Sequence, residues 1–169
     1  IDHVLSGAAL DHLDRPSLQP VDIHQLITGC AETFEMKVKE RQGTMTLVFD
    51  AKHSVVSGDR ELLAQAISNL IDNAEKYSAS RPRITVKTED FGDRIEIRIA
   101  DQGIGIPREM RKKVFDKFFR VQRGNVHNVK GFGLGLSFVK KVILSHRGKI
   151  DLLSDVSRGT EVKILLPRI

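Results

Sequence analysis

The clearest pattern of apolar and polar residues in the chain lies between residues 62 and 77. Because each helical residue advances by roughly 100°, the apolar positions of this stretch share one half of a helix, as a core-facing stripe does. They are Leu62, Leu63, Ala66, Ile67, Leu70, Ile71 and Ala74. Asn69, Asn73 and Lys76 cluster at one margin of the stripe. A buried amide without a partner costs about 1–3 kcal/mol, so Asn73 is either satisfied structurally at the edge of the core or bound to a ligand.

Similar patterns and their punctuating residues predict the other elements. The signals include Asp22 and Asp59 as helix N-caps, Pro107 as a helix start, and the alternation of Ile95, Ile97 and Ile99 along a strand. Helices are predicted over residues 1–13, 23–41, 62–77, 107–115 and 134–146, and strands over 18–22, 44–50, 55–56, 83–89, 94–101, 149–153 and 160–166. Residues 118–131 lack periodicity and predict a long loop, which is usually functional when ordered. Because helices interrupt hairpins, the predicted fold class is α+β: a two-layer α/β sandwich with helices packed on one face of a mixed, mostly antiparallel sheet.

Composition narrows the class of protein. The chain has 169 residues, of which 40% are apolar and 29% charged, as expected of one globular domain. Cys30 is the only cysteine, which excludes an intrachain disulfide, and the six histidines lack metal-ligand spacing. Aromatic residues make up 5% and tryptophan is absent, so we expect no nucleic-acid partner.

The positive charge is concentrated in one segment. The chain carries +5 overall, whereas residues 107–131 hold eight cations and two anions, a net charge of +6. The remainder of the chain is therefore at −1. Such a local cationic segment suits an anionic ligand or an acidic partner.

Two glycine clusters follow the central helix. Residues 101–107 read DQGIGIP at the end of a predicted strand, and residues 131–136 read GFGLGL at the start of a helix. Alternate glycines let the backbone approach a ligand, and a helix start favours phosphate. The dinucleotide fingerprint fails because its G-x-G-x-x-G spacing is absent, and the P-loop fails because no G-K-[ST] triplet occurs.

In combination, these motifs resemble the ATP-binding catalytic domain of sensor histidine kinases, in the superfamily of gyrase-, Hsp90- and MutL-type ATPases. The resemblance covers roughly residues 17–169, with every motif in the family's order. The motifs are an asparagine box at 69–78, a first glycine box at 101–105, a phenylalanine box at 115–120, a second glycine box at 131–136, and the terminal pair Gly159-Thr160.

The resemblance implies ATP and Mg²⁺ as cofactors. Asn73 would ligate Mg²⁺ through its amide oxygen, which suits a metal that takes oxygen ligands. Lys76 would contact the phosphates, and Tyr77 would pack on the nucleotide or simply complete the edge of the core. Asp101 would accept a hydrogen bond from the adenine amino group, and Thr160 would add a water-mediated contact. The other implied nucleotide-binding positions are Gly103, Gly105, Ile106, Gly131, Gly133, Leu134, Gly135 and Leu136.

Asn69 distinguishes the branches of the superfamily. The ATPase members carry a water-activating Glu at the corresponding position, whereas a carboxamide cannot act as a general base. The resemblance therefore implies transfer of the γ-phosphoryl group to a histidine rather than to water. Arg120 is the candidate for stabilising charge on that group, which gives Asn69, Lys76 and Arg120 as the expected catalytic set.

The family's phospho-acceptor, a His followed by an acidic residue on a two-helix hairpin, has no match, since His3, His12 and His24 precede Val4, Leu13 and Gln25. Residues 1–15 are therefore expected to be the end of that hairpin and a linker, and residues 16–169 the catalytic domain. The implied partners are the hairpin of the same kinase and a response regulator. We expect a homodimeric, cytoplasmic parent protein, and the sequence leaves open an inner-membrane anchor.

Two other functions remain open at this stage. One is a degenerate nucleotide-binding or protein-interaction module with the same fold, which the intact Asn73, Asp101 and glycine boxes disfavour. The other is a Ser-directed kinase of the anti-sigma type. The phenylalanine box favours the histidine kinase over that alternative.

Overall fold

The structure of the protein is a computed structural model, which describes residues 16–78, 80–119 and 135–169. Its main element is a five-stranded sheet in the order β2-β4-β5-β7-β6. The strands are β2 (Thr44–Phe49), β4 (Arg83–Phe91), β5 (Arg94–Asp101), β6 (Lys149–Asp155) and β7 (Gly159–Pro167). Strand β2 runs parallel to β4, and every other pair is antiparallel. The mixed, mostly antiparallel sheet predicted from the sequence is thus confirmed.

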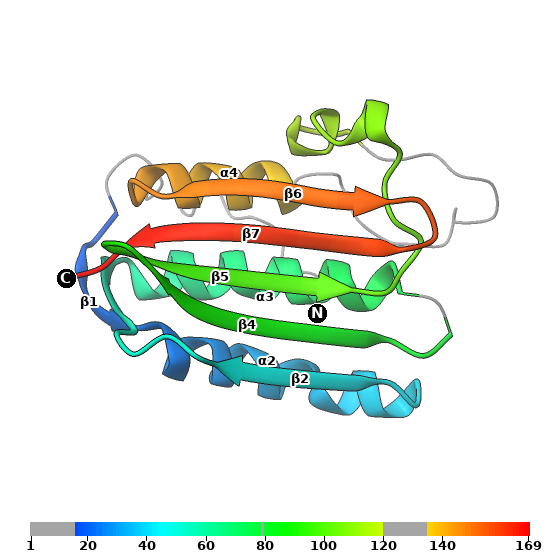
Figure 1. Ribbon diagram of the computed structural model, residues 1–169, viewed down its shortest axis with the longest axis horizontal. Coiled ribbons are helices and arrows are strands. Elements are labelled where there is room, and N and C mark those ends of the chain that lie inside the picture. The colour runs from blue at the N-terminus through cyan, green and yellow to red at the C-terminus, as the bar shows by residue number, and fades with distance from the viewer. Residues whose placement is uncertain (1–15, 79, 120–134) are drawn as a thin grey trace.

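Three helices cover one face of this sheet (Figure 1). They are α2 (Ile23–Glu40), α3 (Arg60–Lys76) and α4 (Gly135–Ser145). The apolar side chains of the central strands, such as Ile97 and Ile164, are fully buried beneath them. Alternate residues of a strand point to opposite faces, so burying one face leaves the other in solvent. The two-layer sandwich follows from this alternation and is confirmed.

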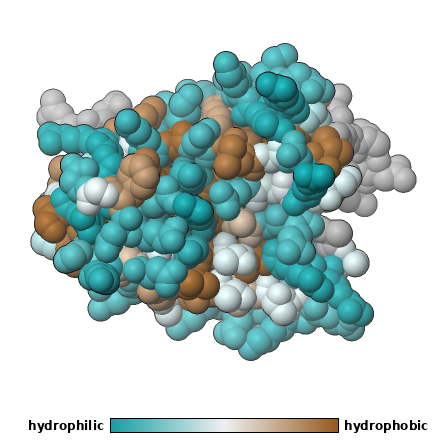
Figure 2. Space-filling view, viewed as in Figure 1, coloured by the Kyte–Doolittle hydropathy of each residue, from teal (hydrophilic) through white to brown (hydrophobic). Residues whose placement is uncertain are grey.

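The open face of the sheet is mostly hydrophilic (Figure 2). Lys87 Nζ lies 2.9 Å from Glu89 Oε1, and Arg98 Nη2 lies 3.3 Å from Glu89 Oε2. Lys163 Nζ lies 3.6 Å from an oxygen of the buried Glu96, which also pairs with Arg98. Charges paired in this way keep the face soluble rather than available to a third layer.

Two aspartates begin the first two helices, as predicted. Asp22 accepts hydrogen bonds from the backbone N–H groups of the first turn of α2, and Asp59 does the same for α3. Such caps satisfy donors that have no partner within the helix. Asp22 also ends β1 (Gln19–Asp22), which pairs only with β3 (Val55–Gly58) in a small second sheet, as its Pro20 requires.

The relative placement of α3 and α4 is fixed where the C-terminal end of α4 meets the N-terminal end of α3. His146, which follows α4, is buried, and its Nε2 accepts a 2.9 Å hydrogen bond from the backbone N–H of Asp59. Its Nδ1 lies 2.7 Å from the carbonyl oxygen of Val142 and donates to it. The end of α4 therefore meets the start of α3, so the two helices run antiparallel. The start of α4 consequently lies beside the second half of α3.

The structure differs from one predicted helix and does not describe another. The expected helix over 107–115 is instead two short 3₁₀ turns, η1 (Arg108–Met110) and η2 (Lys113–Phe115). Of these turn residues only Val114 is buried, so a continuous helix would have no apolar stripe to stabilise it. The expected helix over 1–13 lies outside the described residues. Within the residues described, no helix is both long and apolar enough to cross a bilayer.

Candidate nucleotide-binding site

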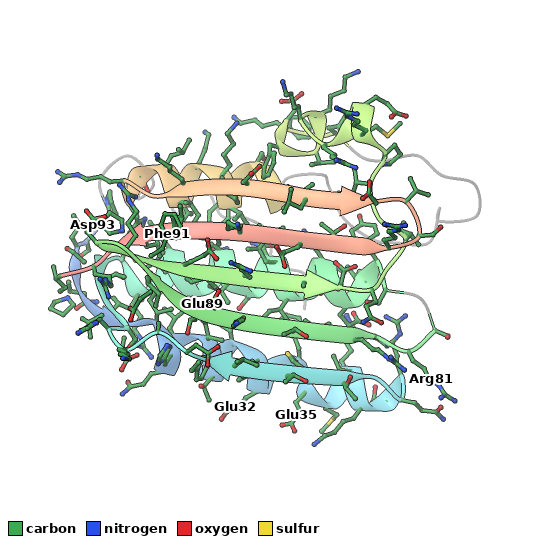
Figure 3. The ribbon with its side chains drawn as sticks, viewed as in Figure 1. Glu32, Glu35, Arg81, Glu89, Phe91 and Asp93 are labelled. Carbon is green, nitrogen blue, oxygen red and sulfur yellow. The ribbon has the colours of Figure 1, made fainter. Side chains whose placement is uncertain are left out.

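Three polar residues form a row across the end of the sheet. Asp101 is paired with Thr160 between β5 and β7, and Thr160 is paired with Ser154 between β7 and β6. Paired residues point to the same face, and two residues back along these strands the paired side chains, Ile99 and Val162, are buried under the helices. The row therefore lies on the helix-covered face, where the apolar core gives way to polar side chains. The opposite end of the sheet is marked by Phe91 and Asp93 (Figure 3).

Asp101 is held by the backbone through one of its two carboxylate oxygens. Its Oδ1 accepts hydrogen bonds from the N–H of Gly103 at 2.8 Å and of Thr160 at 3.3 Å. Burial raises the pKa of Asp101 to about 6, and the two N–H groups only partly oppose that effect. All hydrogen bonds from described residues go to Oδ1. Oδ2 is therefore the oxygen that can accept a hydrogen bond from a ligand.

The loop after β5 is tied to elements on both sides. Ile104 donates its N–H to the carbonyl of Tyr77 at 3.1 Å and accepts from the N–H of Ser157 at 2.9 Å. Ile106 donates its N–H to Ser154 Oγ at 2.8 Å. Tyr77 is the residue that caps α3, and Ser157 lies in the turn between β6 and β7. The first glycine box is thus a fixed wall of the site.

The glycines of this loop are required by backbone packing. A Cβ atom at Gly103 would lie 2.2 Å from the carbonyl oxygen of Tyr77, and one at Gly105 would lie 1.8 Å from that of Asp155. Gly105 also has a φ of +68°, which other residues rarely adopt. The family resemblance gave these glycines only as nucleotide-binding positions. The close approach of loop to α3 and to β6 is a further reason for them, and only the structure reveals it.

Replacing Gly105 with alanine is expected to lower the free energy of unfolding by at least about 2 kcal/mol, because a left-handed residue with a side chain costs roughly 1–2 kcal/mol and the Cβ overlap adds to it. Gly92→Ala is the matched control, since Gly92 has a φ of +60° but open space around its Cβ position. Urea unfolding of both variants measures the difference. Equal losses in the two variants would contradict the close approach at Gly105.

The polar margin of α3 lies beside the start of α4. A Cβ atom at Gly135 would be 3.6 Å from Asn69 Oδ1 and 3.9 Å from Asn73 Nδ2. Asn69 donates its Nδ2 to the carbonyl of Gln65 at 3.0 Å, as an amide on a helix commonly does. The half-buried carboxamide of Asn73 has no hydrogen bond to any other described residue. Of the two interpretations of Asn73, this arrangement favours the one that binds a ligand.

The carboxamide of Asn73 fits a magnesium ligand in its chemistry. Mg²⁺ takes oxygen ligands, keeps several waters and shares the phosphates of a nucleotide, so it needs few protein groups. Among the described residues, no three His, Cys, Asp or Glu side chains gather as a metal cluster. The amide oxygen of Asn73 is thus chemically suited to be one protein ligand of such an ion.

Lys76 is engaged within its own helix. Its ammonium pairs with the carboxylate of Asp72, one turn earlier. Asp72 in turn lies 3.6 Å from the ammonium of Lys37 on α2. A contact of Lys76 with a phosphate group would therefore exchange one anionic partner for another.

A buried carboxylate anchors the end of α3, and sequence reasoning assigned it no role. Glu75 is 2% exposed and pairs with both Lys37 of α2 and Arg41, the residue that follows α2. Arg41 also donates to the backbone carbonyls of Glu75 at 2.6 Å and of Ser78 at 3.2 Å. Burial raises the pKa of Glu75, but the two cations outweigh it and the net pKa is lowered. The cluster fixes the segment that carries Tyr77 and its carbonyl.

The phenylalanine box is only partly described. Phe115 and Phe119 pack against the core, and Lys140 Nζ lies 5.6 Å from the ring centre of Phe115. Phe118 is 72% exposed and has a φ of +64°. Arg120, Gly131, Gly133 and Leu134 lie outside the described residues, as does the segment 1–15. Ile106 and Leu136 are half-buried beside the core.

A hollow of about 610 Å³ lies between the segment that follows the first glycine box and the turn between β6 and β7. Its lining residues are 106–109, Arg111, Asp155, Val156 and Arg158. Two of these lining residues are hydrogen-bonded to each other, with Arg111 Nη2 donating to Asp155 Oδ1 at 2.6 Å. The lining includes none of Asn73, Asp101 and Thr160. The hollow is therefore distinct from the row of polar residues, although Ile106 borders both.

Comparison with known proteins gives a consistent result. The family model described as "Histidine kinase-, DNA gyrase B-, and HSP90-like ATPase" matches residues 58–169. The chain is 41% identical over 152 residues to Sensor protein RprX of Bacteroides fragilis (strain YCH46), which covers 89% of this chain and 29% of that protein. The nucleotide-free catalytic domain of histidine kinase ThkA has a TM-score of 0.79 and 25% identity, over 90% of this chain and 96% of that one. Mycobacterial sensor histidine kinase MprB has a TM-score of 0.74 and 31% identity, over 89% of this chain and 97% of that one.

The chain belongs to the family of histidine kinase-, DNA gyrase B- and HSP90-like ATPases. Its relatives place it with the ATP-binding domains of sensor histidine kinases, in agreement with the resemblance found in the sequence. Because the chain spans only 29% of the length of RprX, it corresponds to one part of such a sensor.

Proposed function

We propose that this domain binds Mg²⁺-ATP and transfers the γ-phosphoryl group to a histidine on the helical hairpin of its own kinase, within a two-component system. The observation that carries the proposal is that the loop after Asp101 is hydrogen-bonded, through the N–H of Ile104, to the carbonyl of Tyr77 at the end of the helix that carries Asn73. Among the described residues, nothing donates a hydrogen bond to Asp101 Oδ2 at the end of β5 or pairs with the amide of Asn73 at the margin of α3. The first suits an amino group on a base, and the second suits a metal on the phosphates.

Asp101 supports adenine rather than guanine. A carboxylate oxygen accepts hydrogen bonds, so it pairs with the 6-amino group of adenine and repels the 6-oxo group of guanine. The backbone N–H groups on Oδ1 hold the carboxylate in one orientation. In this proposal Thr160 lies next to the base, while Gly103 and Gly105 keep the loop close against it.

Asn73 would hold Mg²⁺, and Lys76, Gly135 and Leu136 would border the phosphates. When bound, Mg²⁺ neutralises charge on the phosphate oxygens during transfer. Tyr77, at the end of α3, would pack against the nucleotide. Arg120 is proposed for the γ-phosphoryl group, and Gly131, Gly133 and Leu134 for the phosphates.

Asn69 supports transfer to a side chain rather than to water. A carboxamide takes up no proton at neutral pH, so it cannot activate a water molecule. Its amide nitrogen is also engaged with the backbone of its own helix. We therefore expect slow hydrolysis of ATP by the domain alone, and rapid sustained turnover would instead indicate an ATPase.

The partners proposed are the phospho-acceptor hairpin and a response regulator. The exposed ring of Phe118 suits contact with an apolar helix. Histidine kinase ThkA, a relative in fold at 20% identity and a TM-score of 0.76, was solved in complex with the response regulator protein TrrA. We extend that class of partner to this chain, together with a homodimeric parent and a cytoplasmic location for this domain.

Replacing Asn73 with alanine is expected to weaken the binding of ADP at least tenfold in the presence of Mg²⁺, because an amide oxygen on a cation contributes about 1.5–3 kcal/mol. Affinity in excess chelator should change little, since no metal is then held. Isothermal titration calorimetry with and without Mg²⁺ measures both values. Gln65→Ala, one helical turn before Asn69, is the matched control and should bind as the unchanged protein does. Loss of affinity by N73A in chelator as well would refute the metal role.

Phosphotransfer requires its own test. The domain, mixed with Mg²⁺, γ-labelled ATP and a separately produced hairpin from the same kinase, should label the hairpin on histidine. The product should be acid-labile and stable to alkali, as a phosphoramidate is. Absence of nucleotide binding at millimolar ATP would favour the interaction-module alternative, and an acid-stable product would favour a Ser-directed kinase.

A further inference from the structure

Ser154 lies on the edge strand β6, at the end of the polar row away from Asp101, and is itself almost fully buried, at 6% exposed. Three hydrogen bonds meet at its hydroxyl oxygen. It donates to the carbonyl of Gly159 at 2.8 Å, receives the N–H of Ile106 at 2.8 Å, and lies 2.8 Å from Thr160 Oγ1. The family resemblance assigned no role to this residue.

Counting protons settles the direction of the third bond. A serine hydroxyl has one proton to donate and two lone pairs to accept with. The only proton of Ser154 goes to the carbonyl of Gly159, because a carbonyl oxygen can only accept. One lone pair takes the N–H of Ile106. Thr160 must then donate its hydroxyl proton to the remaining lone pair of Ser154.

The consequence for the site lies at Thr160. With its proton committed to Ser154, the hydroxyl of Thr160 offers only lone pairs to a ligand. Its neighbour in the row, Asp101, is a carboxylate and also accepts only. The end of the sheet is therefore an unbroken acceptor surface, formed by one charged and one neutral oxygen group.

We propose that Ser154 is a positioning residue that determines base specificity, by fixing the hydroxyl of Thr160 as an acceptor so that the site selects a 6-amino purine over a 6-oxo purine. The inference rests on the proposed function, because it needs a purine next to Asp101. Without Ser154, the hydroxyl of Thr160 can rotate and donate to an oxo group, in a direct contact that replaces the water-mediated one expected from the resemblance. Discrimination would then depend on Asp101 alone.

The test compares ADP with IDP, whose base carries a 6-oxo group and a protonated N1 in place of the 6-amino group. Dissociation constants are measured by calorimetry for the unchanged protein, Ser154→Ala, Thr160→Val and the double variant. S154A is expected to reduce the preference for ADP over IDP by about tenfold, the value of one hydrogen bond. T160V has no hydroxyl to orient. Adding S154A to T160V should therefore leave the ratio of the two dissociation constants as it is in T160V alone.

The ratio separates positioning from a merely structural role. A structural defect lowers the affinity for ADP and IDP by the same factor and leaves their ratio unchanged, and that result would overturn the proposal. A further change of the ratio by S154A in the T160V background would overturn it as well. Failure of the unchanged protein to bind either nucleotide would instead refute the proposed function.

A second variant at this position keeps the test decisive if S154A does not fold. Ser154→Cys keeps nearly the same volume, but its thiol is a weak donor and a weak acceptor. It should narrow the ADP preference in the same direction as S154A. Should S154A unfold below the assay temperature, an unchanged ratio in S154C would count against the proposal by itself.

Discussion

Replacing Asp101 with asparagine should lower the affinity for ADP by about 100-fold or more, close to 2.7 kcal/mol. The asparagine oxygen can still accept the N–H groups of Gly103 and Thr160 at the position of Oδ1. Its NH₂ group then replaces the free carboxylate oxygen. A donor would face the donor on adenine, so the ADP preference should invert toward IDP. Calorimetry with both nucleotides measures this, and Asp93→Asn, at the exposed far end of the sheet, is the control.

The same substitution should stabilise the folded domain at neutral pH. Burial raises the pKa of Asp101 from 3.8 to about 6, so the folded state disfavours the ionised carboxylate. The stability that the protonated form of Asp101 contributes is complete below about pH 3.8 and is lost as the pH rises through the folded pKa of about 6. The melting temperature of D101N should therefore exceed that of the unchanged protein increasingly over this window. A difference in melting temperature that does not change with pH would contradict a buried, ionised carboxylate. A variant that is more stable but binds ADP more weakly would mark Asp101 as a functional residue.

Replacing Glu75 with glutamine should lower the free energy of unfolding by about 2 kcal/mol at pH 7, because it leaves two cations beside a buried neutral group. That corresponds to roughly 6 °C in melting temperature for a domain of this size. Affinity for ADP should also fall, since the end of α3 holds the carbonyl that receives Ile104 N–H. Thermal unfolding followed by circular dichroism measures the first effect.

The control for Glu75 is an exposed pair on the neighbouring helix. Glu35 and Lys39 lie one turn apart at 2.6 Å, and Glu35→Gln should cost no more than about 0.5 kcal/mol. Because the pKa of Glu75 is lowered, its stabilisation is present above about pH 4.5 and is lost as the pH falls through the folded value. The difference in free energy of unfolding between E75Q and the unchanged protein should therefore disappear at acidic pH. Equal losses in E75Q and E35Q would contradict the anchoring role.

Local patterns determined the elements of this domain. The stripe from Leu62 to Ala74, the caps Asp22 and Asp59, and the alternation of Ile95, Ile97 and Ile99 each predicted an element that the structure contains. These signals succeed because they depend on neighbours within one turn or one strand. The segment 107–115 is the exception, because Pro107 is a typical helix start but the residues after it lack the apolar stripe that would sustain a helix.

Only the tertiary structure decided how the site is built. The sequence identified Asp101, Asn73 and Thr160 one by one, through motifs that lie far apart in the chain. The register of β5, β7 and β6 brings Asp101, Thr160 and Ser154 into one row, and a register is set by pairing across strands. Ser154 and Glu75 went unassigned because a buried serine and a glutamate have no signature of their own. Their roles arise from the partners that folding supplies.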